Sequence, residues 1–161
     1  MNRITATAIG MVLAAGLAVA APSNSATDLV ARYYAATTEA DQVANWRDWH
    51  PEASHHIDVF TGLPGQDFSF SYALSDWENL PDWQSSPELQ TALEGYAETD
   101  RSAREQTVAL DGATTVVTST AKVAYTWDGY SGTMKETDRF EIIPFLGRNL
   151  IRKVTTTYDF R

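Results

Sequence analysis

The sequence predicts an α+β domain in which a curved antiparallel sheet of about six strands is wrapped on three helices. Apolar residues recur at helical spacing in the N-terminal half, and they alternate at strand spacing throughout the C-terminal half. Turn sequences separate the predicted strands, and Asp111-Gly112 is the strongest hairpin signal among them. Helices and strands segregated along a chain in this way are typical of an α+β domain.

Residues 1–20 have the pattern of a secretory signal. A short polar, positive start precedes an almost wholly apolar or small run, and Ala18-Val19-Ala20 fits the small-x-small cleavage pattern. We therefore predict cleavage after Ala20, a periplasmic or secreted location, and no stable membrane insertion after cleavage. The alternative is a retained anchor, but the run is marginal for the ~20 apolar residues of a bilayer span. Residues 21–161 are enough for a single domain with one core.

The composition excludes several kinds of partner and site and is rich in aromatic residues. The chain has 12 Lys and Arg against 21 Asp and Glu, with no basic run, so nucleic acid is not expected as a partner. The absence of cysteine excludes disulfides, thiolate metal sites and lipoprotein attachment. Five Trp, seven Tyr and six Phe supply core side chains and are numerous enough to line a cavity as well.

Two helices are expected at the start of the domain. The first covers 25–38, where Ser25 can cap the helix and Asp28 lies in its first turn. Helical spacing places Tyr33 on the core side of this helix. The second helix covers about 41–49 and ends before Pro51.

The next segments, 53–60 and 68–72, should pair as a hairpin around a glycine-rich turn. Alternation puts His55, Ile57 and Val59 on one face of the first strand, and His56 and Asp58 on the other.

The remaining elements follow with less regular signals. Residues 73–84 indicate only a broken helix, whereas 86–96 has a serine cap and an apolar stripe that ends at Tyr96. The C-terminal part should then form four strands, which are residues 102–110, 113–127, 133–143 and 150–160.

Three stretches resemble one superfamily in their order and spacing. They are LVARYYAATTEAD in the first helix, WRDWHPEASHH at the second helix and first strand, and ETDRFEII near the end. The pattern resembles the nuclear-transport-factor-2-like superfamily, which includes the SnoaL-like polyketide cyclases and the ketosteroid isomerases. The resemblance spans 21–161 and implies a cone with a mixed sheet, a pocket for a small apolar or aromatic molecule, and a homodimer through the sheet face.

The resemblance also implies roles for single residues. Ketosteroid isomerases use a tyrosine on the first helix, which matches Tyr33, and a neutral aspartic acid late in the sheet, which matches Asp138. The aspartate base of those enzymes falls on Ile57 here, with Asp58 one residue beyond and facing the other way. A bulge at the start of the strand is the alternative that would restore Asp58 to this position.

Asp138 is informative without any family. Alternation places it beside Phe140 on the apolar face of its strand, where a carboxyl must be hydrogen-bonded or protonated. A neutral Asp138 could donate to a carbonyl oxygen together with Tyr33; the alternative is a structural carboxylate paired with Tyr33, an arginine or backbone amides. Glu136 shares this face but lies nearer the hairpin end, so we expect it to reach solvent.

All three histidines lie between residues 50 and 56, which invites a metal hypothesis. Strand geometry argues against it, because the adjacent His55 and His56 must point to opposite faces. We therefore predict no metal site and no cofactor. His55 is the first candidate for a general base, and His56 could instead be oriented by Asp58. The alternative for both histidines is a surface or edge-strand position.

The predicted pocket is lined by aromatic and apolar side chains, which are Trp46, Trp49, Ile57, Tyr125, Trp127 and Phe140. The favoured function is binding of a small apolar or aromatic molecule. The first alternative is a cofactor-free isomerase, cyclase or dehydratase, in which Tyr33 and Asp138 hold an oxygen while His55 or Asp58 moves a proton. The second is a protein-interaction module, or carbohydrate binding on Trp77 and Trp83. A serine hydrolase is not indicated, since no GxSxG motif is present.

Overall fold

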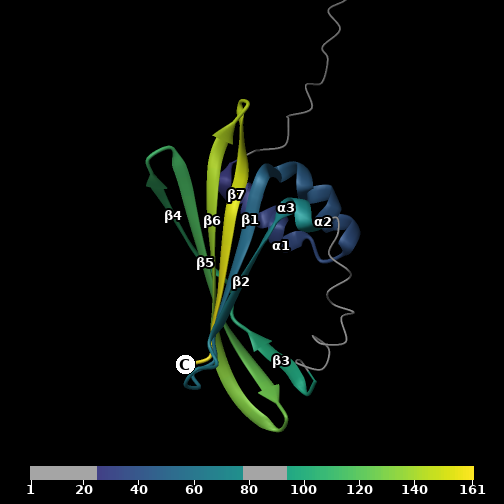
Figure 1. The fold of residues 1–161 in the computed structure, drawn as a ribbon, viewed down its shortest axis with the longest axis vertical. Helices are drawn as coiled ribbons and strands as arrows, with labels where there is room; N and C mark the ends of the chain where they lie inside the picture. The colour runs from purple at the N-terminus through teal and green to yellow at the C-terminus, as the bar shows by residue number, and fades with distance from the viewer. Residues whose placement is uncertain (1–24, 78–93) are drawn as a thin grey trace, which may run out of the picture.

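The computed structural model describes residues 25–77 and 94–161 (Figure 1). The predicted signal segment and most of the predicted helix at 86–96 lie outside the described residues. The helical elements are α1 (Ala26–Ala35), α2 (Glu39–Asn45), the 3₁₀ turn η1 (Trp46–Asp48) and the single turn α3 (Leu74–Trp77). No helix in the described ranges is long and apolar enough to cross a membrane.

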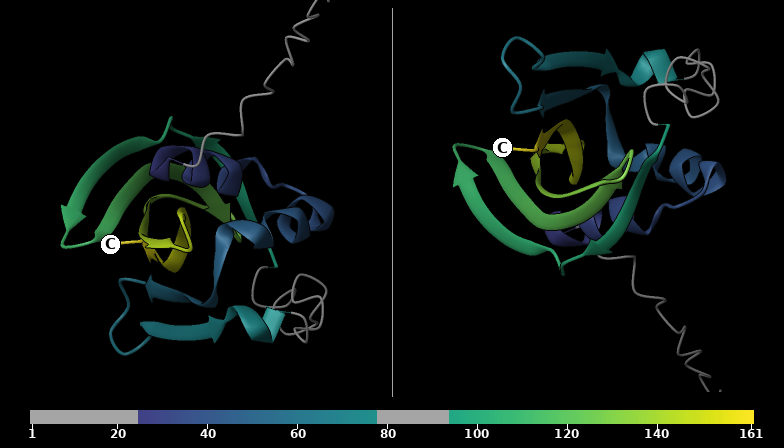
Figure 2. Two further views of the ribbon diagram at one scale, coloured as in Figure 1. Left: turned by 90° about the horizontal axis from the view of Figure 1, so that it is seen from above. Right: turned by 90° about the horizontal axis from the view of Figure 1, so that it is seen from below.

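Within the described residues, seven strands form one mixed sheet, against about six expected from the sequence. Their bounds are β1 (Trp49–Phe60), β2 (Phe68–Ala73), β3 (Tyr96–Arg101), β4 (Glu105–Asp111), β5 (Thr114–Trp127), β6 (Tyr130–Phe145) and β7 (Arg148–Asp159). The order across the sheet is β2-β1-β7-β6-β5-β3, and β4 also pairs with β5. β1 and β7 run parallel, and the other pairs are antiparallel. Figure 2 shows that the sheet is strongly curved. The predicted α+β class with a curved mixed sheet is confirmed.

The start of the domain follows its capping residues. Ser25 caps α1 and accepts a hydrogen bond from the Asp28 amide, as predicted. Thr38 and Asp41 form a capping box, so α2 begins at Glu39, two residues earlier than expected. The predicted end of this helix at Trp49 is wrong, because α2 stops at Asn45 and β1 already begins at Trp49.

The predicted hairpins are confirmed, with tighter turns. β1 pairs with β2, and β4 pairs with β5 across Asp111-Gly112. The β5–β6 and β6–β7 turns use only two residues each, Asp128-Gly129 and Leu146-Gly147. All four have positive φ angles, between 47° and 83°. This backbone matches the twist of the flanking strands and lets β6 extend beyond its predicted bounds at both ends.

The predicted strand at 102–110 corresponds to β4, and a further strand that was not predicted, β3, precedes it along the same edge of β5. β3 pairs with residues 123–127 of β5, and β4 pairs with residues 114–120. Between them, Ser102 Oγ accepts a hydrogen bond from the Lys122 amide. The prediction that Tyr96 ends a helix is wrong. This residue begins β3, and its ring stacks on Tyr125 across the strand pair, with ring centroids 5.8 Å apart.

The core lies between α1 and the inner face of the sheet. Its buried residues are Leu29, Val30, Trp49, Ala53, Val117, Phe140, Ile142, Ile151 and Val154. Phe140 was predicted to line the pocket but is fully buried, because Tyr33 and Tyr34 of α1 cover its ring edge-to-face. The ring centroids lie 5.0 Å and 5.9 Å from that of Phe140. Phe140 is therefore the packing support beneath the tyrosines.

Replacement of this support is expected to destabilise the whole domain. Phe140→Ala should lower the free energy of unfolding by about 3–5 kcal/mol, because the residue is fully buried and leaves a cavity. Urea unfolding followed by tryptophan fluorescence measures this change. Val108→Ala is the control, since Val108 is 54% exposed and should cost only a few tenths of a kcal/mol. Equal losses in the two variants contradict this account of the core.

Candidate functional site

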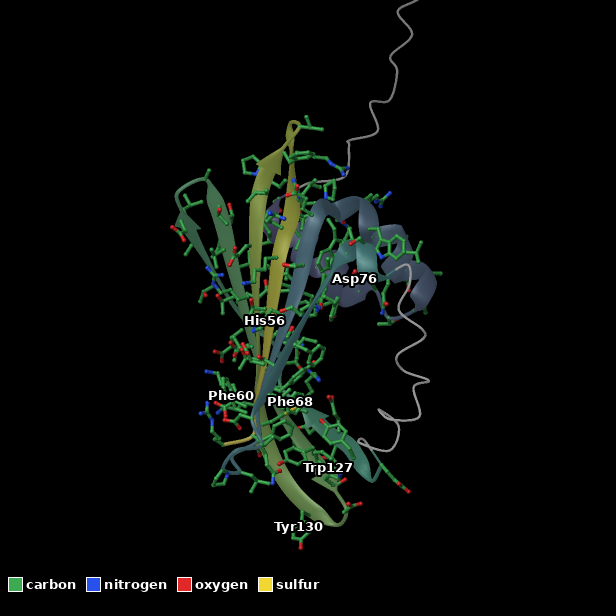
Figure 3. All side chains as sticks on the ribbon, viewed as in Figure 1. His56, Phe60, Phe68, Asp76, Trp127 and Tyr130 are labelled. Atoms are coloured by element: carbon green, nitrogen blue, oxygen red, sulfur yellow. The ribbon has the colours of Figure 1, made fainter. Side chains whose placement is uncertain are left out.

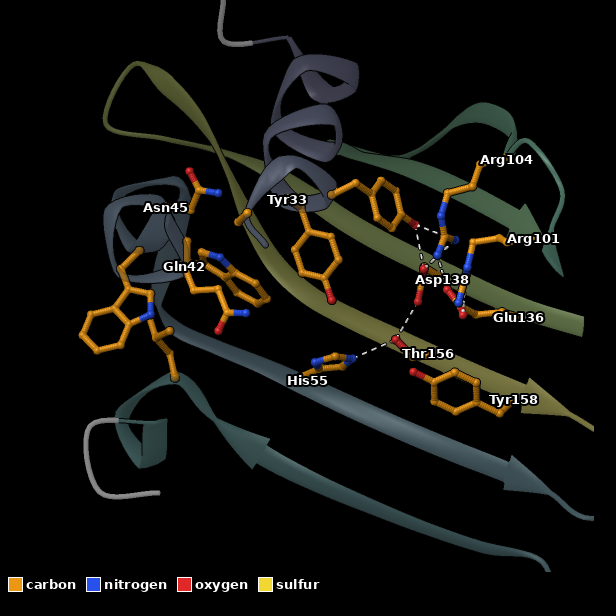
Figure 4. Close-up of a pocket in the computed structure, with 15 residues that line it drawn as sticks. Tyr33, Gln42, Asn45, His55, Arg101, Arg104, Glu136, Asp138, Thr156 and Tyr158 are labelled. Atoms are coloured by element: carbon orange, nitrogen blue, oxygen red, sulfur yellow. Dashed lines mark hydrogen bonds and ion pairs between the residues drawn. The ribbon is translucent and has the colours of Figure 1, made fainter. Parts of the chain in front are cut away.

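A pocket of about 490 Å³ opens between α1, α2 and the inner face of the sheet (Figure 4). Its described lining combines five aromatic rings with a set of charged and polar groups, which are Tyr33, Tyr34, Trp46, Trp49, Tyr158, Gln42, Asn45, His55, Arg101, Arg104, Glu136, Asp138 and Thr156; Ala36 and Leu74 complete it. Such a lining suits a small molecule with an apolar body and a few polar groups.

Asp138 is the polar centre of the pocket wall. Its side chain is almost fully buried. Thr156 Oγ1 donates to Oδ1 at 2.6 Å, and Tyr34 Oη donates to Oδ2 at 2.6 Å. Arg104 Nη1 donates to the same Oδ2 at 3.0 Å. Both oxygens therefore act as acceptors, which is the pattern of an ionised carboxylate rather than a neutral acid.

A second buried carboxylate lies next to Asp138 on β6. Glu136 was expected to reach solvent, but it is only 6% exposed. Arg101 Nη1 donates to Glu136 Oε2 at 2.8 Å, and Arg104 Nη2 donates to Glu136 Oε1. The prediction failed because the two arginines come from the β3–β4 edge and carry their charge over the inner face. Arg104 thus bridges both carboxylates, and its guanidinium also lies 4.1 Å from the ring centroid of Tyr34.

His55 points inward and is held at both ring nitrogens. Its Nε2 lies 2.8 Å from Thr156 Oγ1, and its Nδ1 lies 2.7 Å from Tyr72 Oη. Thr156 gives its only proton to Asp138, so it accepts from Nε2–H of His55. Nδ1 then accepts from Tyr72. The result is a directed chain from Tyr72 through His55 and Thr156 to Asp138, with no free lone pair on the ring.

Burial shifts the proton affinities of these groups. It lowers the pKa of His55 to about 4, with a smaller electrostatic contribution from the neighbouring His56, so His55 is neutral at pH 7. Burial raises the pKa of Asp138, while the hydrogen bonds from Thr156 and Tyr34 oppose that rise. Burial also raises the pKa of Tyr33 well above its ordinary value, so its hydroxyl keeps its proton.

Two tyrosine hydroxyls at the pocket remain open to a ligand. Those of Tyr33 and Tyr158 have no hydrogen-bond partner within the described residues, although both side chains line the pocket. Figure 4 shows the Tyr33 ring between the helical layer and His55, with its hydroxyl directed into the pocket. Burial raises the pKa of Tyr158 as well, so both groups are donors near pH 7. The tyrosine that binds Asp138 is Tyr34, one residue after the expected one.

Not every predicted residue reaches the pocket. Tyr33, Trp46, Trp49, His55 and Asp138 do, whereas Asp58 lies on the opposite face of β1 and binds His56. Ile57 is half-buried and is not part of the described lining.

Tyr125 and Trp127 were expected in the pocket but lie at the far end of β5. They pack there with Tyr96, and Tyr125 also packs with Phe160. The prediction failed because alternation gives the face of a strand but not the position along it, and β5 extends well beyond the helices (Figure 1).

Several site residues were missed from the sequence, namely Tyr34, Arg101, Arg104, Thr156 and Tyr158. Thr156 and Tyr158 follow the apolar Val154 at two-residue steps along the last strand, and that pattern could have placed them on the inner face. Arg101 and Arg104 gave no such signal. Within the described ranges, no group of three or more His, Asp or Glu side chains is arranged to hold a metal ion.

No family model matches the chain, and no curated protein matches it either. Among solved structures, the chain is similar to a ketosteroid isomerase-like protein from Erwinia carotovora, with 15% identity, a TM-score of 0.47, and coverage of 82% of this chain and 92% of that one. It is also similar to a nuclear-transport-factor-2-like protein from Cytophaga hutchinsonii, with 10% identity, a TM-score of 0.40, and coverage of 81% and 93%.

A third similar structure is a candidate polyketide cyclase from a Silicibacter species, with 16% identity, a TM-score of 0.43, and coverage of 83% and 88%. The structures that match are thus of the kinds that the sequence resemblance named. Each likeness concerns the fold alone.

The buried His55 should make stability depend on pH in mild acid. Its pKa is about 4 in the folded protein and near 6.5 when exposed, so its contribution is complete above pH 6.5 and is lost as the pH falls toward 4. Between pH 7 and pH 4.5, the free energy of unfolding should fall about 2–3 kcal/mol more in the wild type than in His55→Gln. Urea unfolding at the two pH values measures this difference.

His56→Gln is the matched control, because His56 lies on the outer face and is 31% exposed. This variant should keep most of the acid sensitivity of the wild type, because burial is the larger cause of the low pKa of His55. Identical pH dependence in the wild type and His55→Gln contradicts the buried, neutral state of His55.

Proposed function

We propose that this chain binds a small molecule with an apolar or aromatic body in the pocket, and that the hydroxyls of Tyr33 and Tyr158 hold a polar acceptor group of that molecule. The observation that carries the proposal is the contrast between these two hydroxyls and the hydrogen-bonded network around Asp138. Asp138, Glu136, His55 and Thr156 already have partners, whereas the two hydroxyls have none among the described residues.

The aromatic lining supports an apolar or aromatic ligand. Trp46, Trp49 and the two tyrosines surround a volume of about 490 Å³, which is within the usual range for a small-molecule site. The buried network of Asp138, Glu136 and the two arginines forms one wall and stays paired. A ligand carbonyl or ether oxygen fits the open donors because a tyrosine hydroxyl donates well to such acceptors.

The signal pattern of residues 1–20 adds that this binding takes place outside the cytoplasm. A homodimer through the sheet face stays a prediction from the resemblance. Carbohydrate binding on Trp77 and Trp83 receives no further support, since Trp83 lies outside the described residues.

A cofactor-free proton-transfer enzyme is the second candidate, and one observation favours it. His55 and Asp138 are joined through Thr156, so a proton can pass between the pocket and a buried carboxylate. This function requires His55 to release Tyr72 or Thr156 when substrate binds, because both ring nitrogens are occupied. Asp58 cannot serve as the base from its place in the structure, since it faces outward and binds His56.

The planar ketone 2-acetonaphthone is a suitable probe, because it combines an aromatic body with one carbonyl acceptor. Tyr33→Phe and Tyr158→Phe should each weaken its affinity about five- to tenfold, since each removes one hydrogen bond of about 1 kcal/mol. Fluorescence titration measures the dissociation constants. Tyr130→Phe is the control, because Tyr130 is 79% exposed and lies outside the described lining. Unchanged affinity in both pocket variants contradicts the proposal.

The same ketone separates binding from catalysis. A proton-transfer enzyme exchanges the methyl hydrogens next to the carbonyl for deuterium in heavy water, and NMR follows this exchange. If the protein only binds the ketone, the titration should saturate, and the methyl hydrogens should exchange no faster than in buffer without protein. Exchange that is faster than buffer and is lost in Asp138→Asn supports the enzyme candidate instead.

A further inference from the structure

The outer face of the β1–β2 hairpin holds a second constellation, separate from the pocket. His56 and Asp58 lie on β1, and Ser71 lies on β2 directly opposite His56. Because strand neighbours alternate, these side chains point away from the face that carries His55. Figure 3 shows His56 on the strands, apart from the helical layer where Asp76 is labelled.

The three side chains form a continuous hydrogen-bonded relay. Ser71 Oγ lies 2.6 Å from His56 Nδ1, and His56 Nε2 lies 3.0 Å from Asp58 Oδ1. The carboxylate can only accept, so Nε2 carries the ring proton and Nδ1 presents its lone pair to the Ser71 hydroxyl. A nucleophile bonded to a base that a third group orients is the diagnostic arrangement of covalent catalysis.

We propose that Ser71 is a nucleophilic serine, activated by His56 and oriented through Asp58, that accepts acyl groups from small activated esters. Ser71 Oγ attacks the carbonyl carbon while its proton moves to His56 Nδ1. The tetrahedral intermediate collapses, the bond to the leaving alkoxide breaks, and His56 returns the proton to that oxygen. Water then attacks the acyl carbon while one of its protons moves to the same nitrogen. The bond to Ser71 Oγ breaks, His56 returns the proton to Oγ, and the carboxylic acid leaves.

Access to the site is open. Ser71 is exposed, and the side chains of His56 and Asp58 keep 31% and 28% of their surface in contact with solvent. β2 is the edge strand at its end of the described sheet, so every second backbone N–H of this strand points away from β1. These edge amides are the donors that the proposal assigns to the developing oxyanion.

The neighbouring side chains on this face are also polar. Ser69 lies opposite Asp58, and Thr155 and Thr157 of β7 lie beside His56 and Asp58. None of these three neighbours adds a charge beside that of Asp58. The arrangement was not apparent in the sequence, because Ser71 is 15 residues from His56 and becomes its neighbour only through strand pairing.

A fluorophosphonate ester tests the nucleophile directly. Ser71 Oγ forms a bond to phosphorus, fluoride leaves, and the serine proton passes to His56 and then to water. Intact-mass spectrometry of the full chain should show one stable adduct, and peptide mapping should place it on Ser71. Ser71→Ala should remove the adduct, and Ser69→Ala is the matched control that should keep the wild-type rate.

The base and its orienting group give two further variants. His56→Gln should slow the labelling about a hundredfold, since a positioned general base contributes ~10²–10⁴-fold. Asp58→Asn should slow it at least tenfold. The rate of p-nitrophenyl acetate hydrolysis, measured as release of nitrophenolate, should also fall more in His56→Gln than in Asp58→Asn.

All these changes lie on an exposed face, and an unchanged urea-unfolding midpoint shows that the variants remain folded. The proposal is overturned if the adduct maps to a residue other than Ser71, if no adduct forms, or if His56→Gln reacts as fast as the wild type. In those cases the relay only holds the edge strand β2 to β1.

Discussion

The two buried carboxylates of β6 impose the constraint on which the pocket depends. Asp138 and Glu136 lie on the same inner face with most of their surface removed from water, and an unpaired buried charge is strongly destabilising. Arg104 contacts both of them, and Arg101 adds a second cation at Glu136. The β3–β4 edge must therefore lie against β5 at a place where both arginines reach inward. Tyr34 and Thr156 complete the shell from α1 and β7, so one ionic cluster ties together α1 and the β3–β4, β6 and β7 strands.

This cluster also decides which groups are left for a ligand. Because Asp138 accepts hydrogen bonds from Thr156 and Tyr34, it sets the direction of every hydrogen bond as far as Tyr72. His55 is left without a free lone pair. The donors left open then include the hydroxyls of Tyr33 and Tyr158 and the indole N–H of Trp46. The pocket is consequently a neutral, donor-lined aromatic cavity beside a self-contained ionic wall, which is a better description of a binding site than of a resting acid–base pair.

The sequence predicted the fold well because the fold depends on local patterns. Alternation and turn residues placed the hairpins, and the separation of His55 from His56 follows from strand geometry alone. The partners of Asp138 were less accessible. Tyr33 and Tyr34 both lie on the core side of α1, and only the tertiary arrangement selects Tyr34 as the donor. Arg101 and Arg104 lie in an exposed-looking segment whose inward reach depends on the break between β3 and β4. The prediction that Glu136 reaches solvent failed for the same reason. Its carboxylate can be buried because arginines that are distant in the sequence pair with it.

The adjacent histidines His55 and His56 differ in their hydrogen-bond partners, and these partners give the two rings different chemical properties. At His55, the hydroxyl of Thr156 stands between the ring and the carboxylate, burial keeps the ring neutral, and Tyr72 caps the remaining nitrogen. At His56, the carboxylate of Asp58 bonds the ring directly, and the remaining nitrogen faces a serine that has a proton to give. Both ring nitrogens of His55 are thus occupied within a buried hydrogen-bonded chain. At the solvent-exposed His56, one ring nitrogen is free to accept the proton of Ser71. The outer face of β1 is therefore better suited to covalent chemistry than the inner face. The pocket on the inner face is better suited to binding a small molecule.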